Sequence, residues 1–353
     1  MQYALKAKPH EPAGFTAPEM GTFMHKILEQ VSREVASMGG YKSVDDETVT
    51  RLCDKYIDEY ITRELNDFHD KSKRFEYLFR RLTGSVHRIV LDLADELRRS
   101  DFQPLSFELD FADTPQLPPL ELGEGEDKLV LTGIADRVDG WLHEGKLYLR
   151  VVDYKTGRKK FDLSDVLYGM NLQMLLYLFS LGENGKLLYG EEIVPAGVLY
   201  VPARDGVISV DGDISDAELE KKRNKGLRRS GLVLSDPEVI RAMEHADTPK
   251  YIPVDFKKNG PAGDALVSAE RLGTLARHID QTLCEMASEL RRGSIAADPY
   301  YAGQQENACI NCDYFDACRF ADGENGESMR STPHLPATKV WSVLEGGEED
   351  GEV

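Results

Sequence analysis

Residues 133–157, GIADRVDGWLHEGKLYLRVVDYKTG, consist of two apolar runs joined by a short turn at residues 143–145. Alternating runs that flank a short turn predict a β-hairpin. Residues i and i+2 of a strand face the same side, so Asp153 and Lys155 project together. The first strand of the hairpin brings Asp136 beside them. The hairpin therefore predicts two carboxylates and one ammonium group at a single site.

Such a group of side chains suits two different roles. Two carboxylates are suitable ligands for a hard cation such as Mg²⁺, which can activate water and offset charge at a scissile phosphate. Lys155 would then orient that water or stabilise the oxyanion. An isolated D-x-K sequence is also common where a strand simply ends in a salt bridge. Metal-dependent cleavage of a phosphodiester and a structural ion pair are both compatible with the hairpin alone.

The composition of the chain is that of a globular protein. It has 353 residues, of which 41% are hydrophobic and 30% charged, which is enough for a sizeable core. No apolar run approaches the roughly 18 residues that a membrane helix needs. The first residues, MQYALKAKPHEPAG, lack the apolar core of a signal peptide. We therefore expect a cytoplasmic protein, whose cysteines stay reduced or bind metal.

The formal net charge of −19 argues against a simple nucleic-acid-binding protein, because phosphate binding favours basic surfaces. Part of the charge lies in the terminal EGGEEDGEV, and we expect residues 322–353 to form a disordered acidic tail. Residues 221–229, KKRNKGLRR, form a local basic cluster. This cluster is either a solvated helix face or a DNA contact.

The rest of the chain predicts a mixed α/β domain with a helical N-terminal block and a central sheet. Expected helices cover 18–31, 45–65, 74–99, 166–182 with Gly182 as its end, and 265–293. Expected strands cover 106–113, 128–141, 146–157 and 191–204, with a proline-rich loop at 114–127. Residues 214–250 predict a charged helical insertion over the sheet. The sequence contains no GxxxxGK[ST] loop, which excludes ATP hydrolysis through a P-loop in this chain.

Two further elements accompany the hairpin. Residues 21–25, GTFMH, place His25 on the first helix among apolar neighbours, where a histidine is either a ligand or an ordinary packed residue. Gln173 and Tyr177 stand at i and i+4, on one face of the helix that follows the D-x-K strand. They form either a functional pair or the polar edge of an amphipathic helix.

In order, GTFMH, GIAD, VVDYKTG and LQMLLY resemble the GxxxH, GxxD, D-x-K and QxxxY motifs of RecB-type nucleases in the PD-(D/E)XK superfamily. The resemblance covers most of the chain and implies a restriction-endonuclease-like core, a mixed sheet flanked by helices. It implies Mg²⁺ or Mn²⁺ ligands at His25, Asp136 and Asp153, a catalytic Lys155, and DNA contacts and site shaping by Gln173 and Tyr177. Asp139 also fits the acidic pattern, but the GxxD register selects Asp136 and leaves Asp139 structural.

Three cysteines, Cys309, Cys312 and Cys318, are spaced C-x₂-C-x₅-C, which favours a metal over disulfides. Zn²⁺ and iron–sulfur clusters both take four thiolates. The segment resembles the C-terminal clasp of AddB-like nuclease domains and of CRISPR-associated exonucleases, in which an upstream cysteine completes a 4Fe–4S cluster. Residues 1–20 contain no cysteine, so we expect an incomplete cluster, and a chain that is a C-terminal fragment or begins at a misassigned Met1. We expect Cys53 and Cys284 to be buried free cysteines within helices.

The resemblance implies that residues 1–321 form a RecB-type nuclease domain. The implied function is metal-dependent hydrolysis of DNA, with exonuclease action on a single strand at a processed end. Residues 225–244, KGLRRSGLVLSDPEVIRAME, resemble AddB, which implies double-strand-break repair and recombination with an AddA-like helicase–nuclease partner. Two alternatives stay open: a stand-alone CRISPR-associated iron–sulfur exonuclease, and a non-catalytic DNA-binding scaffold with a metal clasp.

Overall fold

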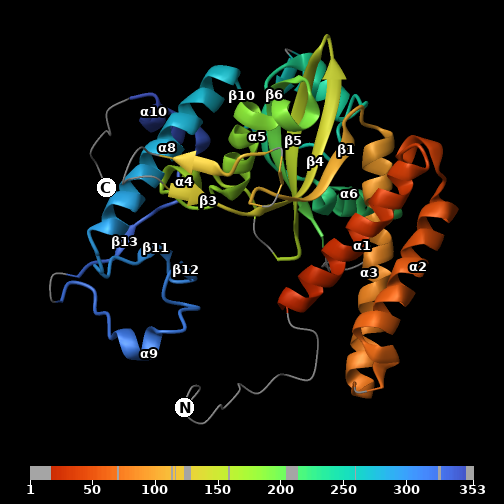
Figure 1. The fold of residues 1–353 in the computed structure, drawn as a ribbon, viewed down its shortest axis with the longest axis horizontal. Helices are drawn as coiled ribbons and strands as arrows, with labels where there is room; N and C mark the ends of the chain where they lie inside the picture. The colour runs from red at the N-terminus through yellow and green to blue at the C-terminus, as the bar shows by residue number, and fades with distance from the viewer. Residues whose placement is uncertain are drawn as a thin grey trace.

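The core of the protein is a six-stranded mixed sheet with the strand order β1-β4-β5-β6-β7-β10 (Figure 1). The computed structural model describes residues 17–69, 71–112, 114–115, 117–122, 129–157, 160–203, 214–258, 260–324 and 327–346. The sheet strands are β1 (Gln103–Asp110), β4 (Ile134–His143), β5 (Lys146–Lys155), β6 (Glu192–Pro202), β7 (Ser230–Leu234) and β10 (Leu266–Val267). The β5–β6 and β7–β10 pairs are parallel, and the other neighbours are antiparallel.

Short strands form three smaller sheets outside this core. They are β2 (Leu120–Leu122) with β3 (Leu129–Leu131), β8 (Asp255–Lys257) with β9 (Gly260–Ala262), and β11 (Tyr300–Gly303) with β12 (Glu306–Asn307) and β13 (Arg330–Ser331). The expected strand 128–141 is thus divided, because β3 pairs with β2 and β4 begins after Gly133.

Helices cover both faces of the central sheet. They are α1 (Ala17–Ser37), α2 (Asp46–Glu64), α3 (Lys73–Arg98), α4 (Leu163–Leu167), α5 (Gln173–Tyr189), α6 (Asp216–Leu227), α7 (Pro237–Met243), α8 (Ala269–Arg291), α9 (Phe315–Cys318) and α10 (Ala337–Leu344), with short 3₁₀ turns at Tyr41–Ser43 and Asn66–Phe68. Figure 1 shows α1, α2 and α3 together on one side of the sheet, and α4, α5, α8 and α10 on the other. The predicted fold class and N-terminal helical block are confirmed.

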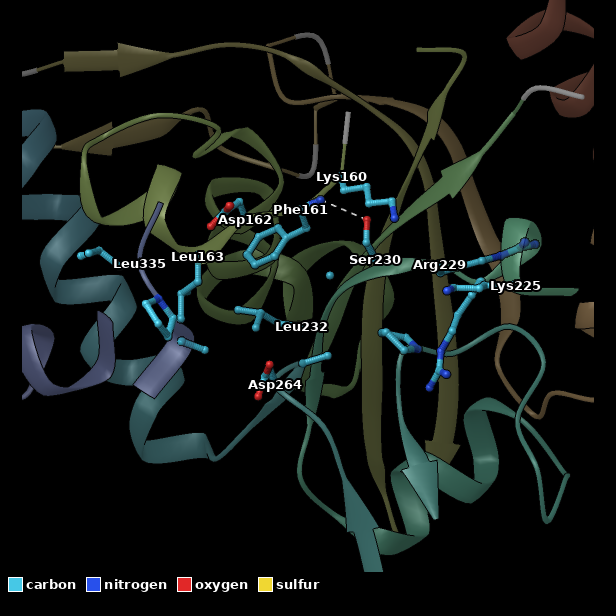
Figure 2. A pocket seen from close by; sticks show the side chains of 16 residues that line it. Lys160, Phe161, Asp162, Leu163, Lys225, Arg229, Ser230, Leu232, Asp264 and Leu335 are labelled. Atoms are coloured by element: carbon cyan, nitrogen blue, oxygen red, sulfur yellow. Dashed lines mark hydrogen bonds between the residues drawn. The ribbon is translucent and has the colours of Figure 1, made fainter. Parts of the chain in front are cut away.

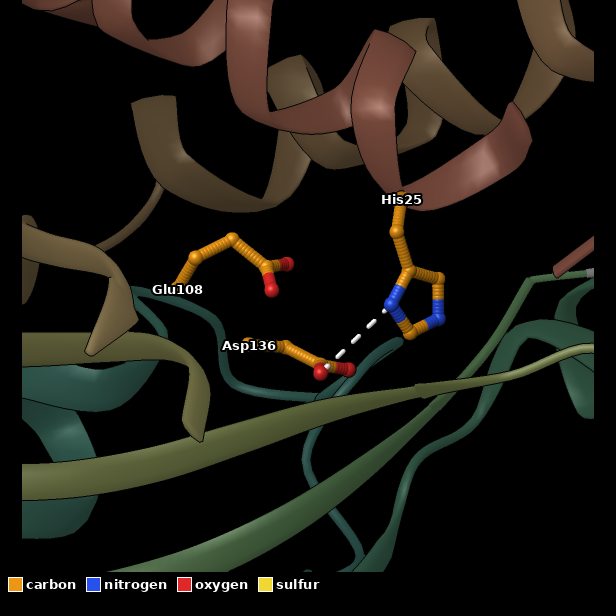
Figure 3. Close-up of side chains that lie close together, drawn as sticks. All are labelled: His25, Glu108 and Asp136. Carbon is orange, nitrogen blue, oxygen red and sulfur yellow. Dashed lines mark ion pairs between the residues drawn. The ribbon is translucent and has the colours of Figure 1, made fainter. Parts of the chain in front are cut away.

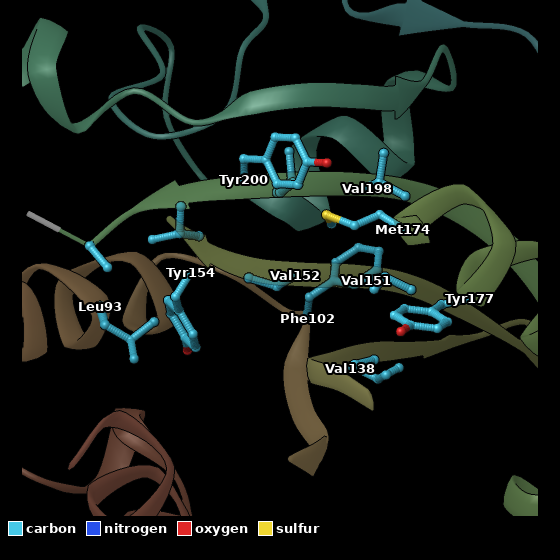
Figure 4. Packing of buried hydrophobic residues seen from close by; sticks show 14 of the residues in the cluster. Leu93, Phe102, Val138, Val151, Val152, Tyr154, Met174, Tyr177, Val198 and Tyr200 are labelled. Carbon is cyan, nitrogen blue, oxygen red and sulfur yellow. The ribbon is translucent and has the colours of Figure 1, made fainter. Parts of the chain in front are cut away.

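The register of the hairpin divides its side chains between the two helical layers. The predicted turn joins β4 to β5, which pair from Arg137–Val152 to His143–Lys146. Because side chains alternate along a strand, Asp153 and Lys155 face the side covered by α5, and Arg150 and Tyr154 face α3. Figure 4 shows the apolar core in which Met174 and Tyr177 of α5 and Leu93 of α3 take part.

Three expectations differ from the structure. Residues 214–250 are not a purely helical insertion, because β7 lies within the central sheet and is largely buried between α6 and α7. The helix expected at 166–182 is broken into α4 and α5 around Gly169, which has a positive φ of 76°. Gly182 does not end α5, which continues to a left-handed cap at Gly190 with φ 81°.

The segment expected as an acidic tail contains ordered structure. Residues 337–344 form α10, and its Val340 and Trp341 side chains are buried in the core. The Arg271 guanidinium stacks 4.8 Å from the centre of the Trp341 ring and pairs with Glu345. Residues 347–353, with most of the terminal acids, lie outside the described residues. The boundary predicted at 321 therefore falls before a helix that packs on the domain.

None of the helices in the described part of the chain is long and apolar enough to cross a membrane.

Candidate functional site

His25 is held at the end of the sheet by the helix that carries it. Its neighbours Phe23 and Met24 are fully buried, which fixes the face that α1 turns toward the sheet. The imidazole Nε2 atom donates a hydrogen bond to the Tyr154 carbonyl at 3.0 Å. The Nδ1 atom lies 3.5 Å from Asp136 Oδ1 (Figure 3). In the neutral ring, the lone pair on Nδ1 therefore points toward a carboxylate.

Glu108 is the residue of this site that the sequence did not reveal. Its strand β1 pairs with β4 so that Phe107 faces Arg137 and Leu109 faces Ala135, which sets Glu108 opposite Asp136. Ligand atoms of His25, Glu108 and Asp136 all lie within 4.8 Å of one another. Glu108 has a left-handed φ of 47°, which is uncommon for a residue other than glycine and recurs at functional sites.

Backbone contacts fix the Asp136 carboxylate between the two strands. Its Oδ2 atom accepts a hydrogen bond of 2.8 Å from the Tyr154 amide. Its charge raises the pKa of two neighbours. Burial and then the Asp136 charge raise the pKa of Glu108, and the same two causes raise that of Asp153. Burial lowers the pKa of His25, but the hydrogen bond and charge of Asp136 outweigh it, so that pKa is raised as well.

Asp153 and Lys155 form an ion pair next to this group. Lys155 Nζ lies 2.7 Å from Asp153 Oδ2, and it also lies 5.0 Å from the centre of the Tyr200 ring. The Asp153 carboxylate is close enough to feel the charges of Asp136 and His25. The predicted D-x-K geometry is thus present, with both side chains on one face.

The donor atoms fit a divalent cation. Three carboxylates and an imidazole meet at one end of the sheet, and carboxylate oxygens are the preferred ligands of Mg²⁺ and Mn²⁺. The raised pKa values of Glu108 and Asp153 express an excess of negative charge that a cation would relieve. His25, Glu108 and Asp136 are the residues that would hold it, with Asp153 adjacent.

Gln173 and Tyr177 lie on α5, as predicted, and contact each other. Gln173 Nε2 donates a hydrogen bond of 2.7 Å to the Tyr177 hydroxyl. The Tyr177 ring stacks on Phe111 with 4.6 Å between the ring centres. A cavity of about 290 Å³ opens beside these side chains. The Tyr177 hydroxyl also packs on Gly133, where an added Cβ would lie 2.0 Å from it.

A buried network of charges lies behind the site, on the opposite face of the hairpin. Tyr154 accepts a hydrogen bond of 2.6 Å from Arg137, which pairs with Asp139 at 2.7 Å. Asp139 also pairs with Arg150 at 2.9 Å, and Arg150 lies 3.6 Å from Glu96 of α3. Buried charges are costly unless they are paired. The structure thus agrees with a structural role for Asp139.

The predicted cysteine clasp is not assembled in this structure. Cys309 is half-buried, and Cys312 and Cys318 are exposed. Among the described residues, no cysteine belongs to a group of three ligand atoms within 4.8 Å of one another. Cys53 is a buried core residue, and burial raises the pKa of its thiol to about 12, which is unfavourable for a ligand. Cys284 is exposed, contrary to the expectation.

Comparison with known proteins gives the family. A family model described as the PD-(D/E)XK nuclease superfamily matches residues 1–319. The chain is 31% identical, over its whole length, to the AddB-type subunit of the ATP-dependent helicase/deoxyribonuclease of Clostridium acetobutylicum. It is 32% identical, over 99% of its length, to the corresponding subunit from Acetivibrio thermocellus. It spans 31% of the length of each of these relatives. With the site at the sheet end and a family match over most of its length, the chain belongs to the PD-(D/E)XK nuclease superfamily.

Proposed function

We propose that this chain is the nuclease part of an AddB-like helicase–nuclease subunit, and that it hydrolyses phosphodiester bonds of DNA. The observation that carries the proposal is the meeting of His25, Glu108 and Asp136 beside the Asp153–Lys155 pair. A metal-ligand set next to an ammonium group is the arrangement that phosphodiester hydrolysis requires.

The residues divide the work between them. His25, Glu108 and Asp136 hold the divalent cation, which when bound supplies a more acidic water and offsets charge at the phosphate. Lys155 neutralises charge on the non-bridging oxygens as the phosphate is attacked. Asp153 keeps the Lys155 ammonium in place through their 2.7 Å contact. Gln173 and Tyr177 shape the approach of the strand.

The finer features of the activity belong to the same proposal. Mg²⁺ or Mn²⁺ is the expected cation, because the donors are oxygen and imidazole nitrogen with no thiolate among them. The substrate is a single strand at a processed DNA end, cleaved from the end. The helicase/deoxyribonuclease name of the relatives supports a role in DNA-break repair and recombination with an AddA-like partner. That name also favours this assignment over a stand-alone CRISPR-associated exonuclease.

A cleavage assay on linear and circular single-stranded DNA tests the proposal. With Mg²⁺ or Mn²⁺, the chain should degrade the linear strand and leave the circle intact, and EDTA should stop the reaction. Degradation of the circle would show an endonuclease instead. Asp153→Asn should abolish cleavage, while Lys186→Gln should not, because Lys186 is exposed in the last turn of α5, away from the site. DNA binding without metal-dependent cleavage would support the scaffold alternative.

A further inference from the structure

The cavity at the far side of Tyr200 has a composition that the catalytic residues do not explain. Its volume is about 480 Å³, within the range of small-molecule sites. Figure 2 shows Lys160 and Phe161 on one side, Lys225 and Arg229 on another, and Leu232 and Asp264 between them. The lining therefore combines an aromatic ring, apolar side chains and several cations.

Strand register connects this cavity to the catalytic residues. Asp153 pairs with Tyr200 of β6, and Tyr200 pairs with Ser230 of β7, which lines the cavity. Paired residues face the same side, so the three side chains form one row. Two strand spacings separate the ends of the row, about 10 Å. This is the length of a few nucleotides at about 3.4 Å per phosphate along one strand.

Aromatic contacts run along the same row. Lys155 Nζ lies over the Tyr200 ring, and the Phe161 ring lies 6.2 Å from it, centre to centre. The Phe161 amide donates a hydrogen bond of 3.0 Å to Ser230 Oγ. Phe161 is only partly buried, and it lines the cavity. Exposed rings beside cations are the usual platform for bases of a single strand.

The charges at the cavity divide into paired and available groups. Arg229 pairs with buried Glu96, and Arg228 pairs with Asp255 at 2.7 Å. Lys160 and Lys225 are exposed, and neither forms an ion pair with a residue in the described ranges.

The two acids of the lining differ in the same way. Asp162 caps α4 by accepting a hydrogen bond from the Ser164 amide, and it lies 2.8 Å from His334 Nδ1. Asp264 is exposed and lines the cavity. The two lysines are therefore the cations most available to a ligand, and Asp264 opposes an anionic one.

We propose that this cavity binds nucleotides of the single DNA strand that passes through the catalytic site, with Lys160 and Lys225 on its phosphates and Phe161 against a base. The inference rests on the proposed nuclease function, since it extends the substrate path of that site. The strand follows the row from Asp153 past Tyr200 to Ser230.

The test measures binding without cleavage. The affinity for labelled oligothymidylates of about 4 to 16 nucleotides is measured in EDTA as a function of salt concentration. For single strands, each phosphate contact contributes about 0.7 to the slope of log K against log salt. Lys160→Gln and Lys225→Gln should each make the slope shallower by about 0.7 and weaken binding about fivefold at 0.1 M salt. Asp264→Asn should tighten binding of the same strands.

Lys186→Gln is the matched control, because Lys186 is exposed but lies near the opposite end of the sheet, where β6 begins. It should leave the affinity and the slope unchanged. The proposal is overturned if both cavity variants bind like the unmutated chain, or if Lys186→Gln loses as much affinity as they do. Because EDTA removes the metal, this result is separate from the cleavage assay. An unmutated chain that cleaves DNA and is indifferent to the cavity variants would retain its function and lose this site.

Discussion

The Tyr177 hydroxyl fills the space that a side chain on Gly133 would occupy, at 2.0 Å from the position of an added Cβ. Gly133 opens the GxxD motif, and Tyr177 closes the QxxxY motif. The two motifs are distant in sequence, and a close approach of α5 to the start of β4 joins them. Only glycine allows that approach, which places Tyr177 next to the acidic group.

We therefore expect Gly133→Ala to destabilise the protein by about 1–3 kcal/mol through overpacking. Removing the ring with Tyr177→Leu should make the Gly133→Ala cost smaller, so the two effects should not be additive. A double-mutant cycle in urea measures this. Gly226→Ala is the control, because nothing lies within 4 Å of its added Cβ in α6. Strict additivity at Gly133 and Tyr177 would contradict the contact.

Glu108→Gln should weaken the divalent cation site while keeping the size of the side chain. We expect the Mg²⁺ concentration for half-maximal cleavage to rise about tenfold or more, as for other losses in a metal site. Glu29→Gln is a nearby control, since Glu29 pairs with Arg33 on α1 and not with the ligand group. An equal shift in the two variants would mean that overall negative charge, and not a ligand, had been removed.

The left-handed backbone at Glu108 makes a separate prediction about stability. With φ at 47°, alanine pays the same backbone cost as glutamate, while glycine does not. Glu108→Gly should therefore be more stable than Glu108→Ala by about 1 kcal/mol, the reverse of the usual order in a strand. Urea denaturation of the two variants measures the difference. A less stable glycine variant would contradict the strained conformation.

Glu96→Gln should unfold the protein more readily than its chemistry suggests. The charges of Arg229, Arg150 and Arg137 outweigh burial and lower the pKa of Glu96, which keeps it ionised. Neutralising it leaves Arg150 and Arg229 buried with less compensation, which costs about 3–5 kcal/mol. Glu64→Gln, in an exposed pair with Lys26, should have a much smaller effect on the urea midpoint. Equal effects would show that the network is not held by charge.

His334 should make the docking of the C-terminal segment depend on pH. Hydrogen bonds to Glu306 and then Asp162 raise the pKa of His334 above its ordinary value. A raised pKa in the folded state adds stability below the unfolded value of about 6.5, and this is lost as the pH rises through the folded value. The cost of His334→Asn should thus be larger near pH 5.5 than near pH 8.5, by less than about 1 kcal/mol because the pair is exposed. Exposed His69→Asn should show no such difference.

Much of the site followed from the sequence because its spacing is local. Asp153 and Lys155 share a strand face, and Gln173 and Tyr177 share a helix face, so periodicity alone pairs them. Asp136 followed from the hairpin. Glu108 did not, because acid in an alternating strand is typical of a solvent-facing position. Its role depends on the register of β1 against β4 and on one left-handed residue, and neither is encoded in a local pattern.

The misread segments have similar causes. The β7 sequence SGLVL is a short apolar run inside a charged, helix-prone region, and only the neighbouring strands β6 and β10 make it part of a sheet. Two residues of α10, Val340 and Trp341, carry most of its burial, too few to reveal a helix beside an acidic terminus. Gly182 did not stop α5 because an isolated glycine is tolerated where its neighbours pack well.

The most direct test of the central claim is the initial rate of single-stranded DNA cleavage against Mg²⁺ concentration, for the unmutated chain and for Lys155→Gln. We predict a rate that requires the cation and that falls by about 10²–10³-fold in the variant, as when one charge-stabilising group is lost from a catalytic site. Lys186→Gln, purified in the same way, should retain the full rate. No metal-dependent cleavage by the unmutated chain, or an unchanged rate in Lys155→Gln, would contradict the account.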